Sequence, residues 1–178
     1  STYPTLYGEK SVLRLLNISD SMHDLDGLGF EKDILGRFED MLIGGEGIIL
    51  VSGPTGSGKT TTLYSTLNKM DQPDVNIVTI EDPIEFDLDN INQAQVNRRS
   101  GVTFASALRA ILRQDPDIIM VGEVRDEETV ELAIRAALTG HLVFSTIHTN
   151  DSAAGFTRLL NWGMEPFLIT STVKGILA

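Results

Sequence analysis

The chain has 178 residues, no cysteine and a formal net charge of −11, and 42% of its residues are hydrophobic. Length and apolar content suffice for one ordinary domain with a sizeable core. The lack of cysteine excludes a disulfide framework and a thiolate metal site and fits a reducing cytosol. The negative net charge argues against a protein whose main function is to bind a nucleic-acid backbone. No apolar run approaches the roughly 18 residues of a membrane span.

The first part of the chain lacks the regular alternation of predicted strands and helices that is found in the rest. YGEKSVLRLL (7–16) alternates enough to predict a strand, and the polar, turn-rich run 19–30 predicts a connection. Apolar residues at helical spacing predict an amphipathic helix over 31–42. We therefore expect residues 1–30 to be the end of an N-terminal subdomain with its linker, and residues 31–178 to be the main domain. A start at Ser1 and an apolar ending GILA suggest a fragment of a longer protein.

From residue 48 onward, short apolar runs alternate with helical patterns. The expected order is strand 48–51, helix 61–70, strand 76–80, a short strand 91–96, helix 104–114, strand 118–122, helix 127–138, strand 142–147 and helix 152–160. Continuous apolar strands separated by helices predict a mostly parallel sheet with helices on both faces. The fold class expected from the residues is α/β.

A glycine-rich stretch, GPTGSGKT (53–60), fits the pattern G-x-x-x-x-G-K-[ST] with a strand before it and a helix after it. Backbone N–H groups from Gly56 to Thr60 can converge on a β-phosphate, helped by the helix N-terminus. Lys59 would bridge the β- and γ-phosphates, and the Thr60 hydroxyl would ligate Mg²⁺. The sequence therefore predicts a nucleoside triphosphate site. Its candidate residues are Gly53, Pro54, Thr55, Gly56, Ser57, Gly58, Lys59, Thr60 and Thr61.

Three carboxylates surround Pro83 in IEDPIEF (80–86), directly after the predicted strand 76–80. Glu81, Asp82 and Glu85 either form a solvated acidic turn or face something cationic. The carboxyl ends of parallel strands are where ligands bind in such sheets, so Mg²⁺ and phosphates would lie nearby. Position alone does not choose among the three acids.

A second acidic residue, Glu123, ends the strand in IIMVGEVRD (118–126). It should arrive beside the phosphates, whereas Asp117 lies at the other end of that strand, roughly 20 Å away. Glu123 is therefore the candidate that orients Mg²⁺ or its waters, and the alternative is an exposed loop glutamate.

The histidines separate by the same argument. His141 and His148 bracket strand 142–147 and lie about 20 Å apart if it is extended. His148 is at the nucleotide end and is a candidate phosphate sensor, whereas His141 is either structural or serves a neighbouring contact. A histidine metal site is not expected, because His23 is remote in sequence and no pair has ligand spacing.

Taken together, these motifs resemble the secretion ATPase superfamily, and within it the branch that drives type II secretion and type IV pilus assembly (GspE/PilB-like). The motifs that carry the resemblance are YGEKSVLRLL, GPTGSGKTTTLY, TIEDPIE, FASALRAILRQDPDIIMVGEVRDEETVELAIRAALTGH, STIHTND and EPFLITSTVKGILA. The resemblance implies a RecA-like P-loop domain that forms a homo-hexameric ring and hydrolyses ATP with Mg²⁺. It also implies a cytoplasmic location peripheral to the inner membrane, through a polytopic platform protein and other machinery components.

The resemblance also assigns roles to residues. Glu85 matches the catalytic glutamate that polarises the attacking water, with Glu81 and Asp82 as supporting or structural acids, Glu123 as the glutamate of the second acidic strand and His148 as the residue near the γ-phosphate. Five arginines fall on positions where some members contact nucleotide or an adjoining subunit, and ordinary salt bridges are the alternative for each. They are Arg14, Arg109, Arg113, Arg125 and Arg158.

The leading hypothesis is thus an ATP-hydrolysing motor subunit for type II secretion or type IV pilus assembly. The alternatives are a pilus retraction ATPase, a RecA-like nucleic-acid motor and a catalytically inactive P-loop module. No nucleic-acid partner is expected, because the chain is acidic and lacks a strip of aromatic and basic residues. The family has a larger N-terminal subdomain and continues past GILA, in many members into a four-cysteine zinc module. We therefore expect residues 1–178 alone to bind nucleotide but to hydrolyse it weakly or not at all.

Overall fold

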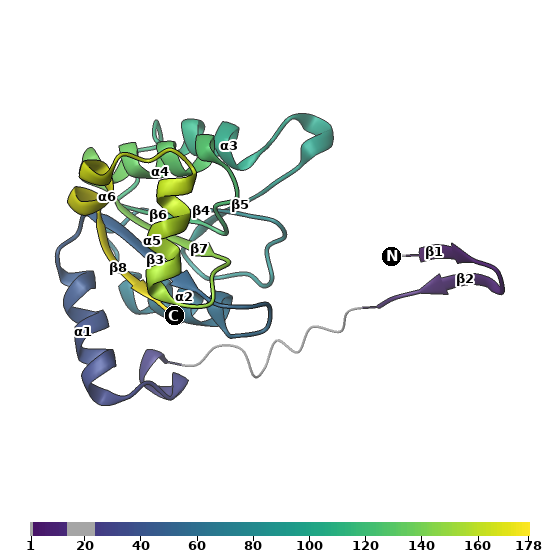
Figure 1. Ribbon diagram of the computed structural model, residues 1–178, viewed down its shortest axis with the longest axis horizontal. Helices are drawn as coiled ribbons and strands as arrows, with labels where there is room; N and C mark the ends of the chain where they lie inside the picture. The colour runs from purple at the N-terminus through teal and green to yellow at the C-terminus, as the bar shows by residue number, and fades with distance from the viewer. Residues whose placement is uncertain (1, 14–23) are drawn as a thin grey trace.

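The computed structural model describes residues 2–13 and 24–178 of the chain, and its main body is a six-stranded parallel sheet (Figure 1). The strands are β3 (Gly47–Ser52), β4 (Ile77–Glu81), β5 (Asn92–Gln95), β6 (Ile118–Val121), β7 (Leu142–Ile147) and β8 (Val173–Leu177). Their spatial order is β5-β4-β6-β7-β3-β8, with every neighbouring pair parallel. The predicted α/β class with a parallel sheet is confirmed.

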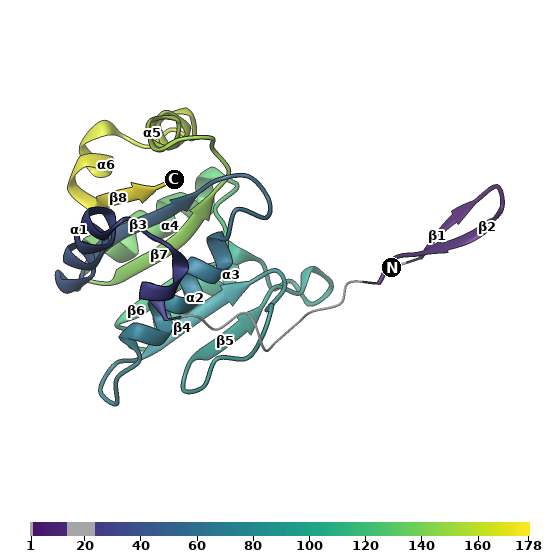
Figure 2. The same cartoon turned by 90° about the horizontal axis from the view of Figure 1, so that it is seen from below.

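Helices cover both faces of this sheet (Figure 2). They are α1 (Lys32–Ile43), α2 (Lys59–Met70), α3 (Phe104–Ile111), α4 (Glu127–Leu138), α5 (Ser152–Asn161) and α6 (Pro166–Thr172), with short 3-10 helices η2 (Leu25–Leu28) and η3 (Arg98–Ser100). Buried side chains of α3 to α6 pack on one face, and those of α1, α2 and η2 pack on the other.

Strand β3 shows why the predicted central strands are mostly apolar. Ile48 and Leu50 belong to the cluster under α3 to α6, whereas Ile49 and Val51 belong to the cluster under α1 and α2. All four are at most 4% exposed. Because successive side chains point to opposite faces and both faces are covered, apolar side chains are favoured along the strand, and the buried Ser52 at its end donates its hydroxyl to the Thr149 carbonyl.

Residues 2–11 form a two-stranded antiparallel hairpin of β1 (Thr2–Thr5) and β2 (Gly8–Ser11). The single strand predicted over 7–16 is therefore wrong in extent, because the chain turns at residues 6 and 7. Thr5 Oγ1 donates to the Gly8 carbonyl at 2.7 Å and accepts from the Tyr7 N–H at 3.3 Å, which closes this turn. The predicted residues 14–16 lie outside the described part of the chain.

The segment from residue 24 to 30 packs with the residues that follow it. Leu25 is 2% exposed and lies in the cluster under α1 and α2, and Phe30 stacks on Phe38 with ring centroids 6.1 Å apart. The predicted division of the chain after residue 30 stays a prediction. Leu25 and Phe30 lie before that point and pack against residues that lie after it.

Apart from the strand over 7–16, every predicted element agrees with the structure within two residues except helix 104–114. Helix α3 ends at Ile111 rather than at residue 114, and the chain reaches Asp115 in a left-handed conformation (φ 52°) before Pro116. Helix α6 and strand β8 were not predicted. Helix α6 begins with Pro166 at its first turn, where a missing N–H costs nothing. Within residues 2–13 and 24–178, no helix has the length and apolarity needed to cross a membrane.

Candidate active site

A cavity of about 620 Å³ lies at the carboxyl ends of the parallel strands. Five segments line it: the loop after β3 with the start of α2, the end of β4 with the loop after it, the start of α3, the end of β6 with the residues after it, and the end of β7 with the residues after it. Lys59, Glu85, Glu123, Arg125 and His148 all line this one cavity, although they are spread over 90 positions of the sequence (59 to 148). This is the edge at which α/β sheets bind ligands.

The glycine-rich loop places the first turn of α2 at the cavity wall. Helix α2 begins at Lys59, two residues before the predicted start, so Lys59 and Thr60 belong to its first turn. Gly56 (φ 81°) and Gly58 (φ 92°) are left-handed, a conformation that other residues adopt only with strain. The free N–H groups of this helix end and its partial positive charge suit an anionic ligand such as phosphate.

Lys59 folds back onto its own loop. Its Nζ donates to the carbonyls of Gly53 at 3.0 Å and Pro54 at 2.8 Å. Burial lowers the pKa of Lys59 below the usual 10.5, and the nearby Glu123 carboxylate partly offsets this. The ammonium is thus held by carbonyl oxygens at the position from which it would reach a phosphate.

Glu123 follows β6 directly after Gly122 and is 9% exposed. Its Oε2 forms an ion pair with Arg125 Nε at 2.6 Å and lies 3.6 Å from His148 Nε2. A Cβ on Gly122 would stand 3.3 Å from the Ile80 carbonyl oxygen, so the glycine permits β6 to approach the end of β4 closely. The predicted glutamate and histidine therefore lie beside each other at the cavity.

The other end of the same strands has a structural role. Asp117 precedes β6, and its Oδ2 accepts the Asn76 N–H at 2.7 Å, so it ties β4 to β6 away from the cavity. His141 precedes β7, and its Nδ1 lies 2.8 Å from the Ala136 carbonyl and 3.1 Å from Thr139 Oγ1. These contacts bind His141 to the C-terminus of α4 and support the structural alternative for it.

The three carboxylates of IEDPIEF occupy three different environments. Glu81 is 3% exposed and accepts hydrogen bonds from Thr79, Gln93 and Tyr64. Asp82 is exposed and lies 3.5 Å from Arg98. Glu85 is half-buried and lines the cavity, and no hydrogen bond or ion pair to its carboxylate is found among the described residues. Of the three, Glu85 is thus the carboxylate that lies at the cavity without a protein partner.

With this geometry in place, comparison with known proteins identifies the family. All 178 residues match the family model described as "Type II/IV secretion system protein". The chain belongs to this family. It is 55% identical to the type II secretion system protein E of Xanthomonas campestris and 54% identical to the type IV pilus assembly ATPase PilB of Myxococcus xanthus, over all its 178 residues. It is 53% identical to the type II secretion system ATPase E of Vibrio cholerae.

These relatives are much longer than the chain, which covers 31% of the first two and 35% of the third. Among solved structures, the pilus retraction motor PilT with bound ADP matches with a TM-score of 0.83 and 38% identity, over 98% of this chain and 52% of that one. The VirB11 ATPase of Brucella suis in complex with sulphate matches with a TM-score of 0.62 and 28% identity, over 89% of this chain and 52% of that one. The chain is a homologue of the type II secretion and type IV pilus assembly ATPases.

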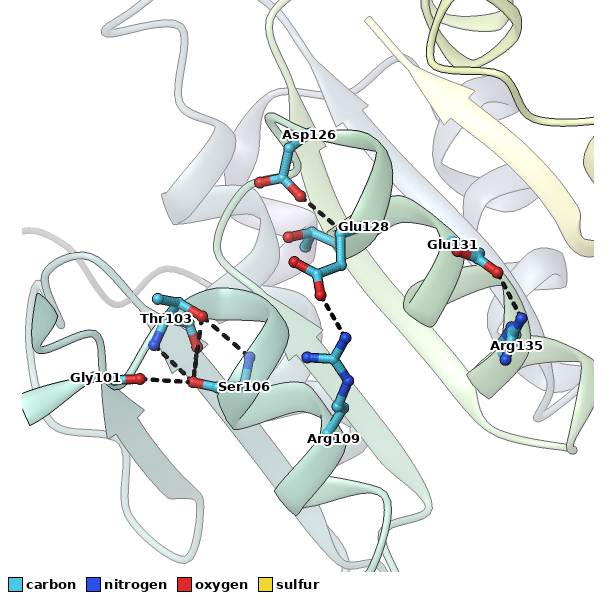
Figure 3. A network of polar contacts seen from close by, with 9 residues as sticks. Gly101, Thr103, Ser106, Arg109, Asp126, Glu128, Glu131 and Arg135 are labelled. Carbon is cyan, nitrogen blue, oxygen red and sulfur yellow. Dashed lines mark hydrogen bonds and ion pairs between the residues drawn. The ribbon is translucent and has the colours of Figure 1, made fainter.

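Two of the arginines predicted from this family's pattern, one on α3 and one just after it, are engaged in polar contacts. Arg109 pairs with Glu128 of α4, on the outer surface of the helical layer (Figure 3). Arg113 donates from Nη1 to the Arg109 carbonyl at 2.6 Å. Neither arginine lines the cavity within one subunit, so their proposed contacts with an adjoining subunit stay predictions.

The other three arginines differ from one another. Arg158 stacks its guanidinium over the Trp162 ring at 4.8 Å and does not line the cavity, whereas Arg125 does. Arg14 lies outside the described residues, as does His23. Of the four candidate arginines that the structure describes, Arg125 alone lies at the nucleotide cavity of its own subunit.

The donor set fits a magnesium ion shared with phosphates. In residues 2–13 and 24–178, no three His, Asp or Glu side chains cluster so as to hold a metal by themselves. Mg²⁺ does not need such a cluster, since it keeps several waters and takes few protein oxygens beside substrate phosphates. Thr60 and Glu123 both line the cavity and would supply oxygen ligands to such an ion, directly or through water.

Apolar residues of the cavity were missed by sequence reasoning. Phe86, Phe104 and Met120 line it and give it a partly apolar wall. Phe86 directly follows Glu85, and Phe104 opens α3 after the capping residue Thr103. From the sequence alone, aromatic residues in helices or strands are predicted to be core residues. Only the structure shows that these two line the cavity.

Proposed function

We propose that the protein carrying this chain hydrolyses ATP and uses the energy to drive type II protein secretion or type IV pilus assembly. The observation that carries the proposal is the single cavity that joins the phosphate-binding loop, Glu85, Glu123 and His148 at the carboxyl edge of the sheet. Its support from relatives is the 53–55% identity to proteins named for these two systems.

In this proposal the residues of the loop bind and orient the triphosphate. Backbone N–H groups at the start of α2 and Lys59 hold the β- and γ-phosphates, and Lys59 exchanges its loop carbonyls for phosphate oxygens. The Thr60 hydroxyl would hold Mg²⁺, and Glu123 would orient its waters. When bound, Mg²⁺ neutralises charge that develops on the phosphate oxygens.

Glu85 orients the attacking water and accepts its proton. Its support is that its carboxylate lines the cavity without a protein partner, whereas Glu81 is saturated with hydrogen bonds and Asp82 lies beside Arg98. His148 lies beside Glu123, with its Nε2 3.6 Å from Glu123 Oε2. A γ-phosphate bound near Glu123 would therefore also be close to His148. Arg125 provides positive charge at the same place.

The assembly and location are proposed with the function. Family resemblance favours a homo-hexamer at the cytoplasmic face of the inner membrane, held there by a platform protein and other machinery components. A retraction motor is the second candidate, because PilT shares the fold with a TM-score of 0.83. Its identity of 38% against 53–55% for the secretion and assembly proteins favours the assembly branch.

The experiment is ATP turnover by the assembled full-length protein, with and without single-stranded DNA. We expect Mg²⁺-dependent hydrolysis that DNA does not stimulate, and its loss in Glu85→Gln with nucleotide binding retained. Glu46→Gln is the control, because Glu46 is exposed and precedes β3 at the opposite edge of the sheet. Hydrolysis that survives Glu85→Gln would show that the residue is misassigned, and strong stimulation by DNA would favour a nucleic-acid motor.

A further inference from the structure

A buried hydrogen-bond network lies directly behind the loop that carries Glu85. Its centre is Glu81, the last residue of β4, which is 3% exposed. Glu81 Oε1 accepts from Thr79 Oγ1 at 2.6 Å and from Gln93 Nε2 at 3.1 Å, and Glu81 Oε2 accepts from the Tyr64 hydroxyl. Such a buried carboxylate is tolerated only because its oxygens are fully bonded.

Tyr64 connects this carboxylate to the backbone of Glu85. A carboxylate accepts hydrogen bonds and does not donate, so the Tyr64 proton points to Glu81. The Tyr64 oxygen is then free to accept the Glu85 N–H, which lies 3.3 Å away. Burial raises the pKa of Tyr64, and its bond to Glu81 raises it further, so the hydroxyl keeps its proton at any working pH. The direction of both hydrogen bonds is thereby fixed.

The Tyr64 ring adds a packing contact to the same loop. Tyr64 is 1% exposed, and its ring meets Phe86 edge to face, with centroids 4.5 Å apart and an interplanar angle of 81°. The two residues held by Tyr64 are therefore consecutive, Glu85 by its N–H and Phe86 by its ring. The Glu85 carboxylate itself has no recorded partner among the described residues, so its place depends on this backbone.

Gln93 of the edge strand β5 holds the loop from the other side. Its Nε2 donates to Glu81 and to the Phe86 carbonyl at 3.3 Å, and its Oε1 accepts the Leu88 N–H at 2.8 Å. One amide side chain thus bonds the central carboxylate and two backbone groups of the loop. We call Glu81, Tyr64 and Gln93 the loop brace.

We propose that Tyr64 is a positioning residue for hydrolysis, which acts through the loop brace by setting the Glu85 backbone relative to the phosphate-binding helix. Helix α2 begins with Lys59 and carries Tyr64 five residues later, so one helix relates the residue that holds the phosphates to the residue that orients the water. The proposal rests on the proposed function of Glu85. It assigns no chemical step to Tyr64, which is 1% exposed and is not among the residues that line the cavity.

The first test is Tyr64→Phe in the assembled full-length protein. Loss of the hydroxyl frees Glu85, and because small misplacements of reacting groups are costly, we expect kcat to fall roughly 10- to 100-fold. The KM for ATP and the Kd for ADP should change by less than about 2-fold, because the contacts that bind the nucleotide equally in the ground state and the transition state are unchanged. Thr66→Val is the matched control, because Thr66 lies on the same helix and is buried, but its hydroxyl donates to the Thr62 carbonyl at 2.7 Å. Equal kcat in both variants would overturn the proposal.

A double-mutant cycle separates positioning from a general structural effect. In a Glu85→Gln background, Tyr64→Phe should lower the residual rate by less than about 2-fold, since residues that act as one unit are not additive. If the two losses multiply, Tyr64 does not act through Glu85 and the proposal is wrong.

A second pair of variants decides the matter if Tyr64→Phe fails to fold. Gln93→Glu keeps the acceptor for Leu88 but removes both amide donors, and it should lower kcat. Gln95→Glu makes the same change two residues along β5, and its carboxylate still accepts the Ile84 N–H that Gln95 Oε1 accepts at 3.1 Å. Gln95→Glu should therefore keep its kcat, and equal losses in both would overturn the brace.

The outcomes also separate the two proposals. A wild-type protein without ATPase activity contradicts the proposed function and the positioning role together. A wild-type protein that hydrolyses ATP and loses this in Glu85→Gln, but keeps its kcat in Tyr64→Phe and in Gln93→Glu, contradicts the positioning role alone.

Discussion

Arg125 and Glu123 form an ion pair of 2.6 Å at the nucleotide cavity, although they lie only two residues apart in the chain. The Arg125 side chain is 61% exposed and that of Glu123 11%, so the cation lies on the open side of the carboxylate. A phosphate group in the cavity would compete with Glu123 for this guanidinium. We therefore expect ligand binding to release Glu123 from Arg125.

Arg125→Ala should weaken nucleotide binding by about 10-fold, because the cavity loses a charge-assisted hydrogen-bond donor and Glu123 is left to repel phosphate. The measurement is the Kd for ADP by calorimetry. Arg158→Ala is the control, since Arg158 stacks on Trp162 outside the cavity and should keep its affinity. Equal Kd values in the two variants would show that Arg125 does not meet the nucleotide.

Nucleotide affinity should fall as the pH rises through the alkaline range. The pKa of Lys59 lies below 10.5 in the free protein because burial disfavours its charge, and Glu123 only partly offsets this. Bound phosphates favour the charged form and raise this pKa, so binding takes up a proton once the pH passes the lowered value. Calorimetry in buffers of different ionisation enthalpy, from about pH 8 to pH 10, measures this uptake.

The control for this pH dependence is Lys59→Arg, whose guanidinium stays charged throughout this range. We expect weaker binding in Lys59→Arg, without the alkaline fall in affinity. A wild-type affinity that is flat with pH, without proton uptake, would contradict a role for Lys59 in holding the phosphates.

Two glycine-to-alanine changes should have opposite effects on stability. Gly122→Ala places a Cβ 3.3 Å from the Ile80 carbonyl oxygen and 3.4 Å from the Glu81 Cα, both backbone atoms of a buried strand, and should cost about 1–3 kcal/mol. Gly36→Ala lies inside α1 with no atom within 4 Å of the new Cβ, and should stabilise by about 0.5–1 kcal/mol. Urea unfolding of both variants measures the difference, and a change of the same sign in each would refute this account.

Residues 1–178 alone should bind ADP and turn ATP over far more slowly than the assembled protein. Of the candidate arginines that the structure describes, only Arg125 reaches the cavity from within the subunit, and an arginine delivered from a neighbour contributes about 10³-fold or more in related phosphoryl transfers. Single-turnover and steady-state rates of this segment and of the assembled protein make the comparison. A rate equal to that of the assembly would contradict the need for a neighbouring subunit.

The elements and the cavity edge were largely predictable from local pattern. The strands around Ile49 and Phe144 are mostly apolar because both faces of the sheet are covered, and glycine spacing marked the start of α2. Strand β8 was not predictable in this way, since Lys174 and Gly175 interrupt its apolar pattern and its pairing with β3 joins residues more than 120 positions apart.

The loop brace could not be predicted from the sequence, for a different reason. Tyr64 falls on the buried face of a helix and reads as core, and only the fold shows that its hydroxyl meets Glu81, 17 residues away. Gln93 likewise reads as a polar edge-strand residue. All three acids of IEDPIEF line the cavity, and which of them keeps a carboxylate without a protein partner depends on these long-range bonds, so local spacing could not choose it and the family resemblance did.

The order of the strands also affects how the chain is made. Strand β3, which leads into the phosphate-binding loop, pairs with β7 and β8, and both follow it in the sequence. At about 5–20 residues per second, a ribosome would need on the order of 10 s to proceed from Ser52 to Leu142. During that part of synthesis this mostly apolar strand has neither of its native neighbours, so its side chains stay without their partners in the sheet until β7 and β8 have been made.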